Sequence, residues 1–231
     1  MNAITKEQYL ENPCRSASIP YWKTACISIP DNIKILHDSE FNTELLMQYM
    51  DEPYFRLQHH MMEVKPVSLP EGYSLCEASV SDFLEHINSC YEDIGITMPE
   101  IQCYVSREQY RSELWLAVKE NCKGKIVATG IAELDREIGE GVLEWIQVSK
   151  DYRRCGLGSY LVLELLWRMR KTAKFVTVSG KCKNPDCPEE LYRKCGFCGN
   201  DVWHILRRCE QTYEYSSARN RKAPVKKISG K

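Results

Sequence analysis

Two glycines separated by one residue, Gly156 and Gly158, stand where an expected strand passes into an expected helix. The start of a helix leaves about four backbone N–H groups without partners in the helix, and it carries a partial positive charge. Glycine also lets the backbone turn tightly and approach a ligand closely. This junction therefore predicts a site for a phosphate or pyrophosphate. The expected helix, 157–172, has an apolar stripe of Leu161, Leu165, Leu166 and Met169.

Side chains beside the glycines supply further donors for such a ligand. Arg153 or Arg154 would add a charge-assisted hydrogen bond, and the Ser159 hydroxyl another donor. A P-loop is excluded because the run G-x-x-x-x-G-K-[ST] is absent here, and the dinucleotide fingerprint would need a third glycine where Leu161 stands. Taken alone, the glycine pair is equally consistent with a tight turn that binds nothing.

The run V-S-K-D-Y-R-R-C-G-L-G, residues 148–158, resembles motif A of the GNAT acetyltransferases. The signature of that family is Arg/Gln-x-x-Gly-x-Gly/Ala, and it grips the pyrophosphate of CoA. Arg153, Gly156 and Gly158 match it position for position.

A second landmark of the family is a tyrosine four residues before a Gly-Phe pair. Tyr192 stands in that relation to Gly196 and Phe197. Asn184, in the preceding loop, is similar to an asparagine that helps to hold the pantetheine arm of CoA. The resemblance covers residues 72–208, including the order of the expected strands and helices.

The resemblance implies an α/β fold with a mixed central sheet of about six to seven strands, helices on both faces, and a splay between the fourth and fifth strands. Acetyl-CoA, the implied co-substrate, would enter that gap, with no metal required. Its pantetheine arm would pair with backbone groups of Ile146, Gln147 and Val148, as an added strand does. Its pyrophosphate would rest on the amides of residues 154–159, which include Cys155 and Leu157.

The implied reaction is direct attack of an acceptor amine, on a small molecule or a peptide, on the acetyl thioester. Glu144, early in the motif A strand, is the candidate base; Glu133 on the preceding strand and a water chain are its rivals. Tyr192 is the candidate proton donor to the departing thiolate. Packing or solvated roles for these residues stay open, and so does a catalytically silent CoA-binding sensor or interaction module.

The chain divides into three parts. Pro66 and Pro70 mark the end of an N-terminal extension, 1–70, whose role is open and which contains an expected helix at 38–50. Residues 71–210 form the expected acetyltransferase domain, and 211–231 a basic tail expected to be flexible. The extension and residues 95–110 are the candidates for shaping the acceptor pocket, and a homodimer is an option.

Charge and hydropathy narrow the choice of partners and compartment. A net charge of −1 gives no global field to attract nucleic acid. The sequence shows no apolar run of the roughly 18–20 residues that a membrane span needs. The N-terminus lacks the apolar core of a signal peptide, so we expect a cytoplasmic protein whose twelve cysteines are reduced.

Four cysteines compete with this interpretation as zinc ligands. Cys182 and Cys187 are followed closely by Cys195 and Cys198. The first gap is longer than the two residues usual in zinc sites, and the second pair brackets the Gly-Phe landmark. We therefore expect no metal there.

Overall fold

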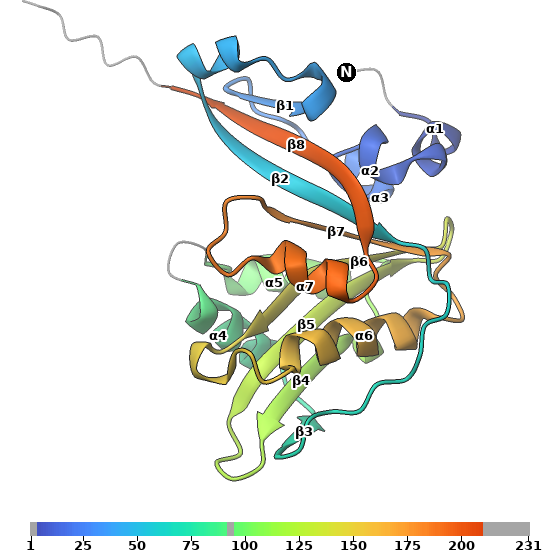
Figure 1. Ribbon diagram of the computed structural model, residues 1–231, viewed down its shortest axis with the longest axis vertical. Helices are drawn as coiled ribbons and strands as arrows, with labels where there is room; N and C mark the ends of the chain where they lie inside the picture. Colours follow the sequence, from blue (N-terminus) through green and yellow to red (C-terminus); the bar gives the residue numbers. More distant parts are fainter. Residues whose placement is uncertain (1–3, 92–94, 210–231) are drawn as a thin grey trace, which may run out of the picture.

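The computed structural model describes residues 4–91 and 95–209, and these form an eight-stranded mixed sheet (Figure 1). The strand order is β1-β8-β2-β7-β6-β5-β4-β3, and all neighbours are antiparallel except β6 and β7. The strands are β1 (Ile33–His37), β2 (Tyr49–His59), β3 (Tyr73–Cys76), β4 (Trp115–Glu120), β5 (Ile126–Asp135), β6 (Glu140–Val148), β7 (Phe175–Lys181) and β8 (Cys198–Arg208).

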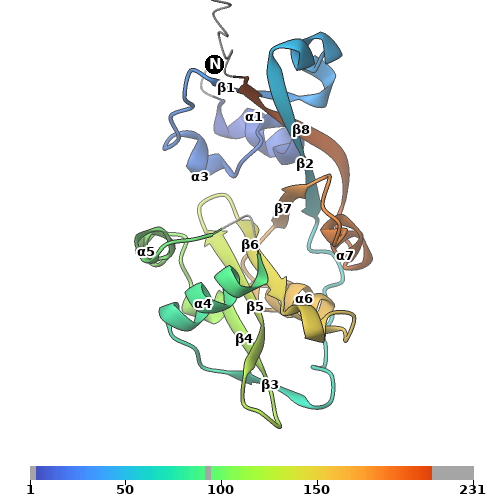
Figure 2. The same ribbon diagram turned by 90° about the vertical axis from the view of Figure 1, so that its left-hand side faces the viewer.

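Helices cover both faces of the sheet, as expected (Figure 2). One side carries α4 (Val80–Cys90) and α5 (Met98–Ser106), and the other carries α6 (Leu157–Met169) and α7 (Pro188–Lys194). The N-terminal helices are α1 (Lys6–Glu11), α2 (Pro13–Ser16) and α3 (Tyr21–Thr24). Short 3₁₀ turns are η1 (Asp38–Glu40), η2 (Thr43–Met47), η3 (Ser112–Leu114) and η4 (Lys150–Tyr152). Across the described ranges, every helix is too short or too polar to cross a bilayer.

The prediction of a helix at 38–50 is wrong. That stretch contains η1 and η2, and β2 begins at Tyr49. Pairing of β2 with β7 on one side and β8 on the other outweighs the weak local helical pattern. It also buries Phe55 and Leu57.

The sheet has eight strands, rather than six or seven, because β1 and β2 come from the first 70 residues. The basic tail at 211–231 lies outside the described residues.

The fourth and fifth strands counted from β3, which are β6 and β7, part as expected. They pair only where Glu140–Leu143 of β6 faces Phe175–Val178 of β7. Beyond Leu143, β6 pairs with β5 alone. Ile131 of β5 pairs with Trp145 and its neighbour Ala132 with Leu143, which leaves Glu144 as the extra residue of a β-bulge. The bulge and the start of the splay therefore coincide.

Candidate functional site

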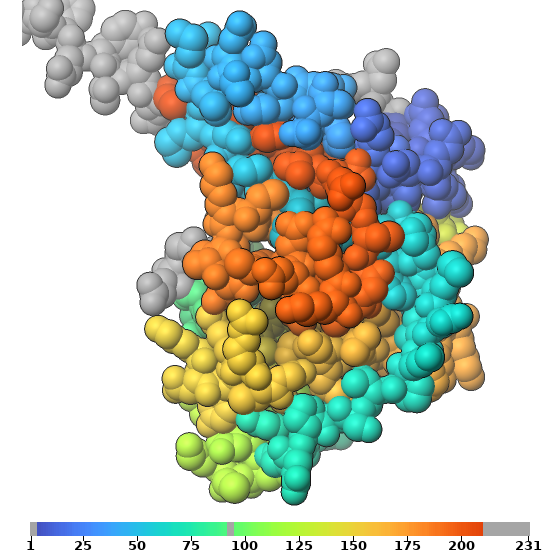
Figure 3. Space-filling model, in the orientation of Figure 1, coloured from blue at the N-terminus to red at the C-terminus, as the bar shows by residue number. Residues whose placement is uncertain are grey.

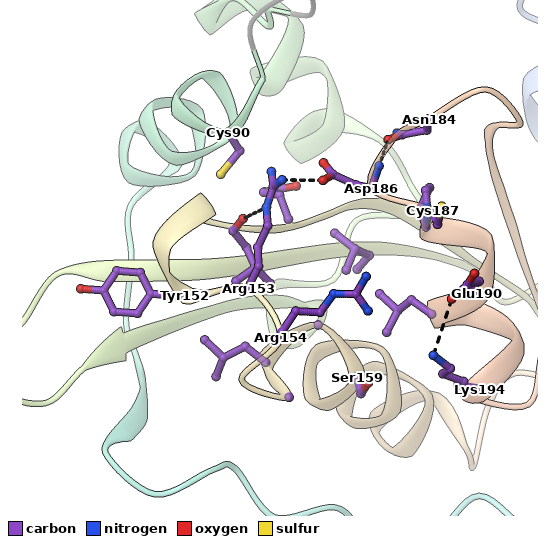
Figure 4. A pocket seen from close by; sticks show the side chains of 18 of the residues that line it. Cys90, Tyr152, Arg153, Arg154, Ser159, Asn184, Asp186, Cys187, Glu190 and Lys194 are labelled. Atoms are coloured by element: carbon purple, nitrogen blue, oxygen red, sulfur yellow. Dashed lines mark hydrogen bonds and ion pairs between the residues drawn. The ribbon is translucent and has the colours of Figure 1, made fainter.

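A pocket lies where β6 parts from β7 and α6 begins (Figure 4). In Figure 3 the yellow residues that lead into α6 lie against the orange segment that leads into α7. Most of the residues expected to bind CoA line this pocket, namely Ile146, Gln147, Val148, Arg153, Arg154, Gly156, Leu157, Gly158, Ser159 and Asn184. Cys155, Glu144 and Tyr192 are not among its lining residues.

The two glycines have different local roles. Gly156 is the N-cap of α6 with φ of +83°, a left-handed conformation that other residues adopt at a cost of roughly 1–2 kcal/mol. A Cβ on Gly158 would lie 3.2 Å from Leu191 Cδ2, so this glycine permits close packing of α6 against α7. Arg154 is also left-handed, with φ of 63°. This turn aims the free amides of the 13-residue helix α6 at the pocket.

Arg153 joins both sides of the pocket (Figure 4). Its Nη1 lies 2.6 Å from Asp186 Oδ1, and its Nε donates to the carbonyl of Val148 at 3.2 Å. The amide of Asp186 in turn donates to Asn184 Oδ1 at 2.9 Å, so Asn184 shapes the loop before α7. The guanidinium expected on a phosphate is thus held by a carboxylate of the protein in this structure.

Sequence reasoning missed several lining residues, including Cys90, Tyr91, Asp186, Cys187, Glu190 and Lys194. Cys90 and Tyr91 come from the end of α4, far away in the sequence. Of these residues, Lys194 is the one that the sequence could have indicated. It is basic, and it lies on the same helix as the Tyr192 landmark, one turn after Glu190. For Asp186 the sequence offers no signal, because its contact with Arg153 exists only in the folded chain.

Tyr192 lies on α7 next to Leu191, which lines the pocket. Its ring packs between Phe55 and Phe197, with centroid distances of 6.2 Å and 5.8 Å, and the residue is 7% exposed. Burial raises the pKa of its phenol above the usual value, so the hydroxyl keeps its proton at neutral pH.

Glu144 and Glu133 lie side by side, with one ammonium between them. Lys23 Nζ from α3 contacts Glu144 Oε1 and lies 3.1 Å from Glu133 Oε2. Burial and the nearby charge of Glu144 raise the pKa of Glu133. Burial also disfavours the charged form of Glu144, but the charge and hydrogen bond of Lys23 outweigh it and lower the pKa of this carboxyl. Of the two candidate bases, Glu144 is therefore the more firmly ionised.

Helix α5 completes the surroundings of this carboxylate pair. Arg107 Nη1 lies 2.7 Å from Glu133 Oε1, and the Tyr104 hydroxyl donates to Glu144 Oε2 at 3.5 Å. Trp145 Nε1 donates to the same hydroxyl at 3.2 Å. Neighbours in a regular strand point to opposite faces, but the bulge lets Glu144 and Trp145 both reach Tyr104. The two segments expected to shape the acceptor pocket, 1–70 and 95–110, thus both supply side chains that contact this carboxylate pair.

The four cysteines of the competing zinc interpretation are free thiols, and Cys195 alone among them is buried. Within 4–91 and 95–209, no three His, Cys, Asp or Glu side chains are grouped so that they could hold a metal ion.

Residues 110–198 match the family model described as an acetyltransferase (GNAT) domain. Solved structures share the fold: a GCN5-related N-acetyltransferase from Sphaerobacter thermophilus has a TM-score of 0.62 at 17% identity over 81% of this chain. A GNAT-family acetyltransferase from Colwellia psychrerythraea has a TM-score of 0.53 at 15% identity over 75% of it. This chain spans 63% and 64% of those two chains, less than two thirds of either. No curated protein matches the sequence.

Proposed function

We propose that this chain, which carries a GNAT acetyltransferase domain in residues 110–198, transfers the acetyl group of acetyl-CoA to an amine. One observation supports this above the others: the amide-lined start of α6 and the stretch of β6 after Leu143, which has no strand partner on its β7 side, border the same pocket. A diphosphate and an extended amide-bearing arm are the two parts of CoA that such a pocket can bind.

Each part of the pocket then has a role. The amides of residues 154–159 receive the pyrophosphate, and Arg154, whose side chain extends from the start of α6 toward α7 in Figure 4, adds positive charge. The free backbone edge of β6 at Ile146, Gln147 and Val148 hydrogen-bonds the pantetheine arm as a neighbouring strand would. The arm so held directs the thioester toward the point where the strands rejoin, beside Glu144.

The chemical step needs one proton acceptor and one proton donor. Glu144, ionised and next to the start of the splay, takes the proton that the acceptor ammonium must lose before its nitrogen can attack. The new C–N bond forms as the C–S bond breaks, and Tyr192 donates its phenolic proton to the CoA thiolate. The second proton that the attacking nitrogen loses passes to the phenolate of Tyr192, so the products are a neutral amide and the CoA thiol. Holding amine and thioester together contributes further, by up to roughly 7–11 kcal/mol of the barrier.

Two measurements on purified protein test the proposal. Calorimetry with acetyl-CoA reports binding, and release of free CoA thiol across a panel of amines reports turnover. Saturable binding with turnover of at least one amine is the expected result. Binding without turnover of any amine would instead support a CoA-binding sensor or interaction module. Absence of binding would refute the pocket assignment itself.

A further inference from the structure

The N-terminal segment 18–23 crosses the sheet at the closed end of the splay, on the face opposite α6. The amide of Tyr21 lies 3.5 Å from Glu140 Oε2 of β6, and Arg56 Nη1 donates both to the carbonyl of Ser18 and to Ser179 Oγ of β7. Glu140 thus points toward the N-terminal segment. Its neighbour Gly141 faces the opposite side of the sheet, where a Cβ would meet Met169 of α6. Segment 18–23 therefore spans the two parting strands and delivers Lys23 to Glu144.

The Lys23 ammonium is one of two cations at the carboxylate pair; the other, the Arg107 guanidinium, binds only Glu133. The side chains of Glu133 and Glu144 are only 1% and 15% exposed, and Arg107 and Tyr104 already take one oxygen of each carboxylate. Glu133 Oε2 is fully buried and accepts no hydrogen bond; Lys23 Nζ lies near it without the geometry of one. A buried acceptor left in this state is costly, so the site has unused capacity for an ammonium N–H.

Aromatic rings complete this site. Lys23 Nζ lies 5.8 Å from the Tyr104 ring centroid and 5.9 Å from that of Trp22, within the range of cation–π attraction. A compact alkylammonium with three N–H donors suits these surroundings. An uncharged arylamine supplies no charge to the two carboxylates.

We propose that Lys23 holds the place of the acceptor's amino group, and that the acceptor is a primary alkylammonium that displaces the Lys23 side chain from Glu144. This inference rests on the proposed function, because it takes Glu144 as the group that the attacking amine must reach. It names the class of acceptor, and it makes segment 18–23 an internal competitor for the acceptor site.

The helix that carries Lys23 is one short turn, so this side chain is held chiefly by its two carboxylates and the rings beside it. Helix α3 is a single turn of four residues whose N-cap, Pro20, provides no side-chain hydrogen bond. The residues that follow, Ala25 to Ile27, are exposed. Short elements with few buried contacts open locally at small cost in free energy. The side chain of Lys23 can therefore leave without unfolding the sheet.

Lys23→Ala tests the inference, with n-propylammonium as the probe because it replaces the atoms removed beyond Cβ. We expect propylammonium to bind the variant saturably by calorimetry and to raise its unfolding temperature, with little effect on wild type. With acetyl-CoA present, the variant should acetylate propylamine with a KM about ten-fold or more below that of wild type, because the internal competitor is gone. Tetramethylammonium, a cation without N–H donors, should not compete.

Lys6→Ala is the matched control, since Lys6 also ties the N-terminal segment to the sheet region through a 2.8 Å ion pair with Glu137, away from the pocket. It should bind no propylammonium and keep the wild-type KM.

If Lys23→Ala does not fold, Lys23→Met keeps the apolar stem and should still lower the KM for alkylamines. An unchanged KM in the folded variant, or bound propylamine that is never acetylated while other amines react, would make Lys23 a purely structural ion pair and overturn the inference. If propylammonium binds but no amine is acetylated, the result would contradict the proposed acetyltransferase function while still supporting an ammonium-binding site at Glu144.

Discussion

The guanidinium of Arg153 lies 2.6 Å from the carboxylate of Asp186, and this ion pair links the loop before α6 to the loop before α7 across the pocket. The same arginine is the one that motif A assigns to the pyrophosphate. A diphosphate bound in the proposed way would share or exchange this cation with Asp186, whose carboxylate would add like charge beside the ligand.

Asp186→Asn should strengthen acetyl-CoA binding. The pair is partly exposed, so its release is worth about 0.2–1 kcal/mol, or up to roughly five-fold in affinity. Calorimetry at low and high salt measures this, and the gain should shrink as salt screens the charges. Glu189→Gln is the control, because Glu189 pairs with Arg193 and does not line the pocket. Weaker binding by Asp186→Asn would show that the ion pair organises the site.

Gly156→Ala should separate ligand binding from stability. Alanine at φ of +83° costs roughly 1–2 kcal/mol of folding free energy. Gly124→Ala imposes a comparable cost at φ of +67°, in a turn with nothing within 4 Å and outside the pocket lining. Denaturation should show similar losses for both variants, whereas acetyl-CoA affinity should fall about ten-fold or more only for Gly156→Ala. Equal affinities would argue against the cradle.

Tyr192→Phe should lower kcat by about 100-fold while the KM for acetyl-CoA changes little, because the substitution removes only the proposed proton donor. Steady-state thiol release gives both constants. Tyr160→Phe, at another buried tyrosine that does not line the pocket, should behave as wild type. Full turnover by Tyr192→Phe would leave Tyr192 with a packing role between Phe55 and Phe197.

Glu144→Gln and Glu133→Gln should differ in turnover. Each variant leaves Lys23 with one carboxylate, but Glu133→Gln also removes the charged partner of Arg107, so it should lose more stability than Glu144→Gln. We expect kcat to fall about 100-fold for Glu144→Gln and clearly less for Glu133→Gln, because Glu144 is the residue at the splay. The reverse order would make Glu133 the base.

His86 should make the fold sensitive to acid. Its ring nitrogens lie 2.8 Å from Thr129 Oγ1 and 3.0 Å from Ser149 Oγ, and burial lowers its pKa from 6.5 to about 4. As the pH falls from 6.5 to about 4, His86 becomes protonated in the unfolded chain but stays neutral in the folded chain. The free energy of unfolding therefore decreases, by about 3 kcal/mol in total. Denaturant titrations at several pH values measure this slope. His86→Gln should flatten it, and an unchanged slope would assign it to other groups.

Much of the domain follows from local pattern. Residues 72–208 contain six strands, β3 to β8, in line with the six to seven that the resemblance implies, and α6 begins at Leu157 as the sequence indicates. Predictions failed in the first 70 residues, where β2 depends on partners more than 100 residues away. A strand buried between two others is decided by those neighbours rather than by its own propensity.

The sequence by itself determined the strand, the Gly-x-Gly turn and the helix of the pocket, because turn conformation and the hydrogen bonds of a helix's first turn involve residues only a few positions apart. Only the tertiary structure decided which charges meet: Arg153 with Asp186, and Lys23 with Glu144 and Glu133. It also decided the bulge that turns Glu144 and Trp145 toward one tyrosine. Electrostatic attraction acts through space between groups that folding brings together, so sequence spacing carries no record of these contacts.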